Sequence, residues 1–290
     1  MSKISEALRK IDVQGVSNTN ELQRTAKQAS AGTDSLRQSA RHADLKDAVP
    51  LHISARVPIV PFSEESNFAA AEQYRIIRTK ILQSANSPRL IAFSSPSRGD
   101  GKTVTCINVA AALSLIDNTS VLILDVDLRC PRVAEAFGIP NTPGIAEVLS
   151  GNVDLRSALV RAREFPNLYI LPAGMAHRNP AELLHSEQWI SIVEHLRSQF
   201  SVVVMDTTPV ALVADYELVQ HISDGVILIV APGRSDRNAY EAALKSIPKE
   251  KLLGIVLNRV PRWWSWKIPA AAYYYKSQNG KQAGHHARLD

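Results

Sequence analysis

The stretch "SSPSRGDGKTVT" contains the residue types that bind phosphate. Gly99 and Gly101 allow backbone N–H groups to close around phosphate oxygens, because a glycine has no Cβ to stand in the way. Lys102 would reach the β- and γ-phosphates of a nucleotide, and the Thr103 hydroxyl would bind Mg²⁺. Pro96 stands where the usual G-x-x-x-x-G-K-[ST] pattern has its first glycine. The triplet Gly-Lys-Thr therefore indicates nucleotide binding only when a strand precedes it and a helix follows it.

Three carboxylates end apolar runs elsewhere in the chain. Asp125 and Asp127 end "VLILDVD", and Asp206 ends "SVVVMD". The carboxyl ends of parallel strands form the edge where open sheets bind ligands, so we expect these side chains to meet at the glycine-rich loop. A single Asp in such a place is as often a cap or turn residue. Three around a phosphate loop favour Mg²⁺ binding and proton acceptance from an attacking hydroxyl. Arg129 would contact a phosphate or pair with an Asp.

The apolar runs also predict the elements that position these residues. Six short, nearly continuous runs alternate with helical segments: "RLIAFSS", "VLILDVD", "NLYILPA", "SVVVMD", "GVILIVAP" and "LLGIVLNRV". Such runs are typical of parallel strands that are buried on both faces. We predict an α/β fold with a doubly wound, mostly parallel sheet, in which the loop joins the first of these strands to the helix "KTVTCINVAAALSLI".

We expect three parts in the 290 residues. Residues 1–60 contain no aromatic residue and should be mostly disordered, because they bury too little apolar surface to offset chain entropy. Within them, residues 2–12 have one helical apolar stripe, which suits a transient helix or a docking peptide. Residues 61–262 should form the nucleotide-binding domain, and residues 263–290 a flexible tail that contains Trp and Tyr.

Composition restricts the cellular setting. The net charge of +5 is too small to indicate nucleic acid. The two cysteines, Cys106 and Cys130, suit buried positions in a reducing cytosol and are too few for a disulfide framework. The chain contains neither a run of about 18–20 apolar residues nor a signal peptide, so we expect a cytoplasmic protein that reaches a membrane only through a partner.

Taken together, "SPSRGDGKT", "VLILDVDLRCPR" and "VVVMDTTPV" resemble the Walker A, A′ and B motifs of bacterial tyrosine kinases of polysaccharide biosynthesis, which are P-loop NTPases. The resemblance implies ATP and Mg²⁺ as cofactors. It implies nucleotide contacts at Gly99, Asp100, Gly101, Lys102, Thr103, Val104 and Asn258, metal contacts at Thr103, Asp127 and Asp206, and catalytic roles for Lys102, Asp125 and Asp127. Of the two paired aspartates, Asp125 is our first choice as the base. Asn258 could instead be a simple turn residue.

Two further segments fit this family. "AEQYRIIRTK" matches an E-x-x-R-x-x-R signature through Glu72, Arg75 and Arg78, which implies a subunit contact that closes a homo-oligomeric ring. The alternative is a solvated helix face with an internal Glu72–Arg75 pair. In the tail, Tyr273, Tyr274 and Tyr275 are the expected phosphoacceptors. About 12 residues separate Tyr273 from the last strand and span at most roughly 40 Å, so both the protein's own site and a neighbour's are within reach, and a ring would favour the neighbour's.

The leading hypothesis is therefore an ATP-dependent protein-tyrosine autokinase that regulates exopolysaccharide production and phosphorylates its tail in trans. The resemblance implies a separate membrane-anchored chain-length and export protein as activator, a counteracting tyrosine phosphatase, and a place at the inner face of the plasma membrane. The segment "PRWWSWK" would pack on the outer edge of the sheet or contact a partner or the membrane. The alternative is an ATP-binding switch without kinase activity. A DNA-partition ATPase fits less well, because Ser97 stands where such proteins have a second lysine.

Overall fold

The computed structural model describes residues 48–53, 68–175, 179–210, 214–234 and 236–260, all within one unit of the chain. The strands are β1 (Val49–Leu51), β2 (Leu90–Ser94), β3 (Val121–Asp125), β4 (Val160–Ala162), β5 (Leu168–Leu171), β6 (Val202–Asp206), β7 (Gly225–Val230) and β8 (Leu252–Leu257). The helices are α2 (Phe68–Leu82), α3 (Lys102–Ser114), α4 (Val133–Phe137), α5 (Ile145–Leu149), α6 (Leu155–Ala158), α7 (Pro180–Leu184), α8 (Glu187–Gln199), α9 (Asp215–Ile222) and α10 (Arg237–Ser246).

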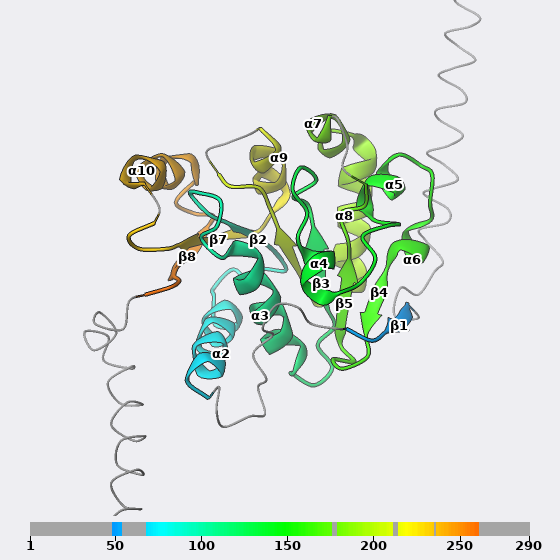
Figure 1. The fold of residues 1–290 in the computed structure, drawn as a ribbon, viewed down its shortest axis with the longest axis horizontal. Helices are drawn as coiled ribbons and strands as arrows, with labels where there is room; N and C mark the ends of the chain where they lie inside the picture. The colour runs from blue at the N-terminus through cyan, green and yellow to red at the C-terminus, as the bar shows by residue number, and fades with distance from the viewer. Residues whose placement is uncertain (1–47, 54–67, 176–178, 211–213, 235, 261–290) are drawn as a thin grey trace, which may run out of the picture. The chain divides into compact units, whose positions relative to one another are not determined.

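These strands form one sheet in the order β1-β4-β5-β3-β6-β2-β7-β8 (Figure 1). The six predicted strands are all present, and they pair in parallel from β5 to β8. Strands β1 and β4 were not expected from the sequence. Strand β4 pairs antiparallel with β5, and β1 pairs parallel with β4 at the outer edge. Strand β1 lies inside residues 1–60, the segment expected to be mostly disordered, while residues 1–47 and 54–60 of that segment lie outside the described residues.

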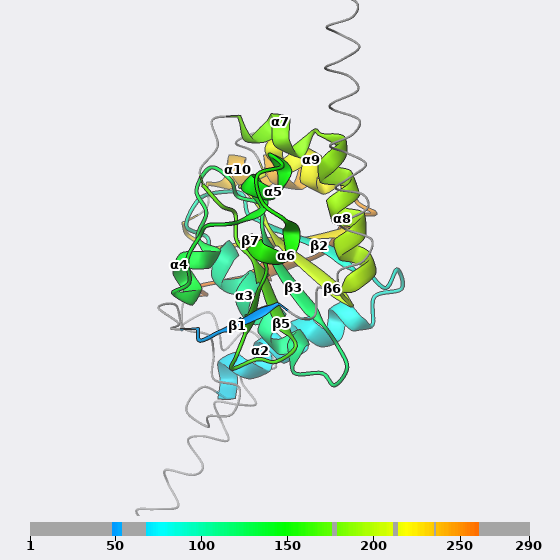
Figure 2. The ribbon, with the colours of Figure 1, turned by 90° about the vertical axis from the view of Figure 1, so that its right-hand side faces the viewer.

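Each face of the sheet carries its own hydrophobic cluster, which confirms the doubly wound arrangement. Alternate residues of a strand point to opposite faces, so Leu122 and Leu124 of β3 join one cluster and Val121 and Ile123 join the other. Helices α2, α3 and α4 cover the second face, and α5 to α10 cover the first (Figures 1 and 2). None of the helices in the described part of the chain is long and apolar enough to cross a membrane.

The register of the three central strands brings the sequence motifs to one edge. Asp206 at the end of β6 lies opposite Phe93 of β2 on one side and opposite Asp125 of β3 on the other. The chain then passes from β2 through residues 95–101 directly into α3. The predicted phosphate loop and the acidic strand ends therefore share the carboxyl edge of the sheet, as expected for a ligand site in this fold.

At the opposite edge, the Asp224 carboxylate holds the start of β2. It accepts hydrogen bonds from the backbone N–H groups of Arg89, at 2.8 Å, and Leu90, at 2.9 Å. It also accepts one from the Arg197 guanidinium at the end of α8, at 2.9 Å. This single side chain thus ties a central strand to the helix that covers it.

We predict that Asp224→Ala lowers the free energy of unfolding by about 2–3 kcal/mol, because two backbone N–H groups and a guanidinium lose a charged partner. Glu241→Ala is the matched control: this carboxylate forms an exposed pair with Arg237 one helical turn away, worth roughly 0.5 kcal/mol. Urea unfolding of both variants measures the difference. Equal costs for the two substitutions would contradict the anchoring role of Asp224.

Candidate active site

The phosphate loop adopts a backbone that depends on glycine. Gly99 and Gly101 have φ angles of 86° and 94°, in the left-handed region that side chains disfavour. The Asp100 carboxylate accepts a hydrogen bond from the Ser97 N–H at 3.0 Å and so closes the loop on itself. Gly101 directly precedes α3, and no side chain caps that helix. Backbone N–H groups and the positive end of the helix dipole thus remain available for an anion.

Lys102 and Thr103, the first two residues of α3, contact the Asp206 carboxylate. The Lys102 Nζ lies 2.6 Å from Asp206 Oδ1, and the Thr103 Oγ1 donates to Asp206 Oδ2 at 2.7 Å. Asp206 is fully buried and Lys102 is nearly so. Burial by itself lowers the pKa of Lys102, but the nearby carboxylates of Asp206 and Asp127 outweigh burial and raise the pKa. The side chain is therefore held as an ammonium.

Asp127 is the acidic residue that borders the open part of the site. Its Oδ2 lies 3.7 Å from Lys102 Nζ, and its Oδ1 accepts from the backbone N–H of Cys130 at 3.1 Å. Burial is the largest cause that raises the pKa of Asp127, although Lys102 opposes it. A carboxylate with a raised pKa beside a phosphate loop is suited to proton acceptance.

Asp125 has a different environment from Asp127. Both of its oxygens accept backbone hydrogen bonds: Oδ1 from Asp127 at 3.1 Å, and Oδ2 from Arg132 at 3.2 Å and Val133 at 3.1 Å. The residue is fully buried and does not line the cavity. Burial, followed by the Asp206 charge, raises the pKa of Asp125 to about 7. This geometry disfavours our choice of Asp125 as the base and indicates a positioning role for the turn after β3.

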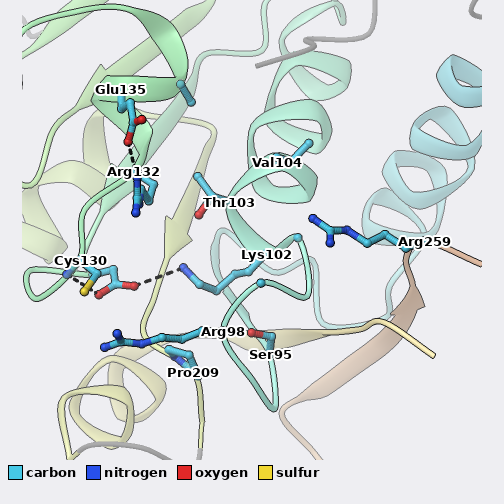
Figure 3. Close-up of a pocket in the computed structure, with 14 residues that line it drawn as sticks. Ser95, Arg98, Lys102, Thr103, Val104, Cys130, Arg132, Glu135, Pro209 and Arg259 are labelled. Atoms are coloured by element: carbon cyan, nitrogen blue, oxygen red, sulfur yellow. Dashed lines mark hydrogen bonds and ion pairs between the residues drawn. The ribbon is translucent and has the colours of Figure 1, made fainter. Parts of the chain in front are cut away.

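A cavity of about 470 Å³ opens beside these groups (Figure 3). It is lined by Ser95, Arg98, Gly99, Gly101, Lys102, Thr103, Val104, Asp127, Cys130, Arg132, Glu135, Ala136, Pro209 and Arg259. Arg98 and Arg132 lie on the Lys102 side of the cavity, and Arg259 lies near Val104 on the other side. The sequence analysis did not assign Arg98, Arg132 or Arg259 to the site, although Arg98 lies in the loop itself and Arg132 follows Asp127 closely.

The structure brings Asn258 to the phosphate loop, where it contacts protein. Its Nδ2 donates to the Asp100 carbonyl at 2.8 Å, and its Oδ1 accepts from the Arg259 N–H at 2.9 Å. A Cβ built on Gly101 would lie 1.9 Å from the same Nδ2. Asn258 thus holds the end of β8 against the loop, and its contact with an adenine remains a prediction.

Two other predicted groups pair within the protein. Arg129 makes a bidentate ion pair with the buried carboxylate of Asp215 in α9, at 2.6 and 3.0 Å. Arg129 was expected either to contact a phosphate or to pair with an Asp, and the structure shows the pairing. On α2, Arg75 contacts Glu72 at 3.2 Å, and Arg78 donates to the Ala112 carbonyl of α3 at 3.2 Å. The internal pair expected as the alternative is present, and the subunit contact remains a prediction. Trp263–Trp266 and Tyr273–Tyr275 lie outside the described residues.

The oxygen atoms of this site fit Mg²⁺. Thr103 and Asp206 present a hydroxyl and a carboxylate within 2.7 Å of each other, and the Asp127 carboxylate lies across from them beside Lys102. No cluster of three His, Cys, Asp or Glu residues suited to a metal occurs in the part of the chain that the structure describes. Mg²⁺ commonly takes only one or two carboxylates and completes its shell with water and substrate phosphates. The donor set therefore suits a metal that arrives with a nucleotide.

Comparisons with known proteins agree with this geometry. A family model described as "AAA domain" matches residues 88–247. The tyrosine-protein kinase CpsD of Streptococcus agalactiae serotype III (strain NEM316) is 31% identical over 192 residues, which cover 65% of this chain and 82% of CpsD. The tyrosine-protein kinase YwqD of Bacillus subtilis (strain 168) is 32% identical over 192 residues, 65% of this chain and 80% of YwqD.

The chain belongs to the bacterial tyrosine kinase family. Solved structures share the fold of this chain. The chimerical protein CapA2B2 matches with a TM-score of 0.66 and 26% identity over 73% of this chain and 93% of that one. The VpsO kinase domain matches with a TM-score of 0.60 and 27% identity over 68% of this chain and 98% of that one. The predicted P-loop NTPase fold is thus confirmed.

The raised pKa of Asp125 predicts a pH dependence of stability. Between its ordinary pKa near 3.8 and about 7, the unfolded chain loses the proton that the folded chain retains. The free energy of unfolding should therefore fall as the pH rises through this window, when Mg²⁺ and nucleotide are absent. Urea unfolding from about pH 5 to pH 8 should show a smaller fall in Asp125→Asn than in the unchanged protein. The same slope in both proteins would contradict the raised pKa.

The contact between Asn258 and the loop predicts a specific rescue. Gly101→Ala should weaken ATP binding, since its Cβ meets the Asn258 amide and its φ of 94° strains any side chain. Asn258→Ala removes the clash, so Gly101→Ala should cost less affinity in an Asn258→Ala protein than in the unchanged protein, although strain at φ remains. Titration of the single and double variants with a fluorescent ATP analogue measures both losses and separates the clash from any contact that Asn258 itself makes with the nucleotide. The same loss in both backgrounds would mean that backbone strain alone explains it.

Proposed function

We propose that this protein is an ATP-dependent protein-tyrosine kinase that phosphorylates its own C-terminal tyrosines and so regulates exopolysaccharide or capsule synthesis and export. The observation that carries the proposal is the meeting of Lys102, Thr103, Asp127 and Asp206 beside a left-handed glycine loop. The names of its relatives, tyrosine-protein kinases, support transfer to a tyrosine. The same groups would also permit hydrolysis of ATP, the activity of the alternative switch.

In this proposal, the loop from Gly99 to Val104 binds the phosphates of ATP. Lys102 has three N–H donors, so it can keep its bond to Asp206 while it donates to a phosphate oxygen. Thr103, Asp127 and Asp206 would hold Mg²⁺, which neutralises charge on the phosphates during transfer. Because phosphoryl transfer is largely a matter of position and charge, these contacts supply most of the acceleration.

Asp127 is the carboxylate best placed to contact the incoming tyrosine. It borders the cavity, whereas Asp125 directs both oxygens at backbone N–H groups. A phenol has a pKa near 10, so a carboxylate helps by orienting the hydroxyl and taking its proton late in the reaction. We therefore assign hydroxyl contact to Asp127 and the positioning of its turn to Asp125, the reverse of the order expected from the sequence.

The remaining features of the proposal concern assembly. Glu72, Arg75 and Arg78 on α2 would contact a neighbouring copy in a ring, which favours phosphorylation of Tyr273, Tyr274 and Tyr275 in trans. A separate membrane-anchored chain-length protein would activate the kinase at the inner face of the plasma membrane, and a tyrosine phosphatase would reverse its action. We keep residues 61–262 as the kinase domain, although β1 extends the sheet with residues from before this boundary.

The kinase activity is tested by mixing two full-length variants. Lys102→Met lacks the phosphate-binding ammonium and should lose about 100-fold or more of its activity, whereas Tyr273–Tyr275→Phe keeps the site and lacks the acceptors. Mass spectrometry after incubation with MgATP should detect phosphate on the Lys102→Met chain. Asp127→Asn serves as a second inactive partner if Lys102→Met does not fold.

Each variant incubated alone is the control and should remain without phosphotyrosine. Phosphate that appears in the unchanged protein but never on the Lys102→Met chain of the mixture would contradict the trans route. ATP hydrolysis without phosphotyrosine in the unchanged protein, with the membrane partner present, would contradict the kinase proposal and favour the switch.

A further inference from the structure

Strand β8 ends the sheet, and among the described residues only β7 pairs with it. Its outer edge therefore presents backbone N–H and C=O groups without a sheet partner, which proteins usually cover or blunt. Two large apolar side chains are exposed on this strand, Ile255 at 41% and Leu257 at 49%. Exposed Ile and Leu side chains on an edge strand favour association with another segment, whereas Lys opposes it. We therefore expect another segment to cover this edge.

A hollow of about 250 Å³ lies between this strand and α2, which are neighbours at one side of the molecule (Figure 1). Ile77 and Ile81 of α2 line it, together with Leu253 and Val256 of β8. Gly254 lies in its lining, and a Cβ built there would meet nothing within 4 Å. The hollow is thus mostly apolar, with Lys80 and Ser84 as its polar lining residues, and has room for a large side chain next to the free edge.

The sequence that directly follows β8 contains such side chains. The backbone turns just after β8, since Arg259 has a φ of 54° and its N–H donates to the Asn258 side chain. A non-glycine residue in this region is typical of a turn. Pro261 follows, and then "RWWSWK" at positions 262–267. Six residues returning in extended form span roughly 20 Å, the length of the six residues of β8.

We propose that residues 262–267 of this chain form a hairpin with β8 and fill the hollow beside α2. Alternate residues of a strand face opposite sides, so Trp264 and Trp266 would lie on one face and Trp263 on the other. Each indole can bury roughly 150–250 Å², enough to cover the hollow and the exposed apolar side chains of β8. Lys80, which lines the hollow, would supply a cation for an indole face.

The consequence for the tyrosines rests on the proposed kinase function. Strand β8 runs parallel to β7, which runs parallel to β2, so all three point toward the phosphate-loop edge. A returning strand leads the chain away from that edge. Tyr273–Tyr275 would then leave from the far end of β8, which favours the site of a neighbouring copy over their own.

The docking is tested by tryptophan fluorescence of the full-length protein with acrylamide as quencher. Trp189 is buried in the core and contributes a constant, shielded signal. In the unchanged protein, the other three tryptophans should be much less quenched than in a synthetic peptide of residues 258–270. Ile255→Glu places a charge on the docking edge and should raise quenching toward the peptide value. Ile190→Glu, at an isoleucine of α8 that is 53% exposed, is the matched control and should leave quenching unchanged.

Gly254→Leu is a second variant, which fills the hollow without adding charge and should also release the tryptophans. Circular dichroism checks that each variant is folded, and the assay needs no kinase activity, so its result is separate from that of the phosphorylation test. If acrylamide quenches the three tryptophans of the unchanged protein as strongly as those of the free peptide, the proposal is overturned. Shielding that appears only at high protein concentration, or only with anionic lipid vesicles, would also overturn it and assign the segment to a second copy or a membrane.

Discussion

The contact between the Lys102 ammonium and the Asp206 carboxylate holds the active site together. Asp125, Asp127 and Asp206 crowd the carboxyl ends of two neighbouring strands, β3 and β6, and two of these residues, Asp125 and Asp206, are fully buried. Unpaired carboxylates in such a place would be costly, because burial penalises the charged form. Lys102 offsets part of this cost, and backbone N–H groups around Asp125 offset another part. The pKa of Asp125 nevertheless stays raised, because burial and the Asp206 charge outweigh these contacts.

The central strands were predictable because their sequence signal is continuous. Strands β3, β6 and β7 are buried along their whole length, so each appears as an unbroken apolar run, which in β3 and β6 ends at an aspartate. Parallel strands buried on both faces leave few alternatives for register, and their carboxyl ends then meet. Once the six runs were recognised, the meeting of Asp125 and Asp206 followed from topology alone.

The edge strands could not be predicted, for a physical reason. Strand β1 contains a proline and β4 an arginine, and each has three residues, so neither has an apolar run or an alternation to detect. They form because the sheet offers an edge, and the Glu164 carboxylate fixes the chain after β1 by accepting from the Ile53 N–H at 3.1 Å. Such pairings depend on the edge that the rest of the folded sheet provides, and a local sequence pattern contains no information about that edge.

The hydrogen-bond and ion-pair partners of the site residues could not be predicted from the sequence either, because they depend on the turns between helices and strands. Asp125 and Asp127 have the same residue type and near-identical sequence surroundings, yet the turn that leads to α4 directs three backbone N–H groups at Asp125, whereas Asp127 accepts one and borders the cavity. Arg129 finds its partner 86 positions away, at the start of α9. Spacing brings acidic groups to an edge, whereas the path of the connecting chain decides which acts on a substrate and which holds the backbone in place. A rigid centre with short, specific turns therefore allows neighbouring carboxylates to take different roles.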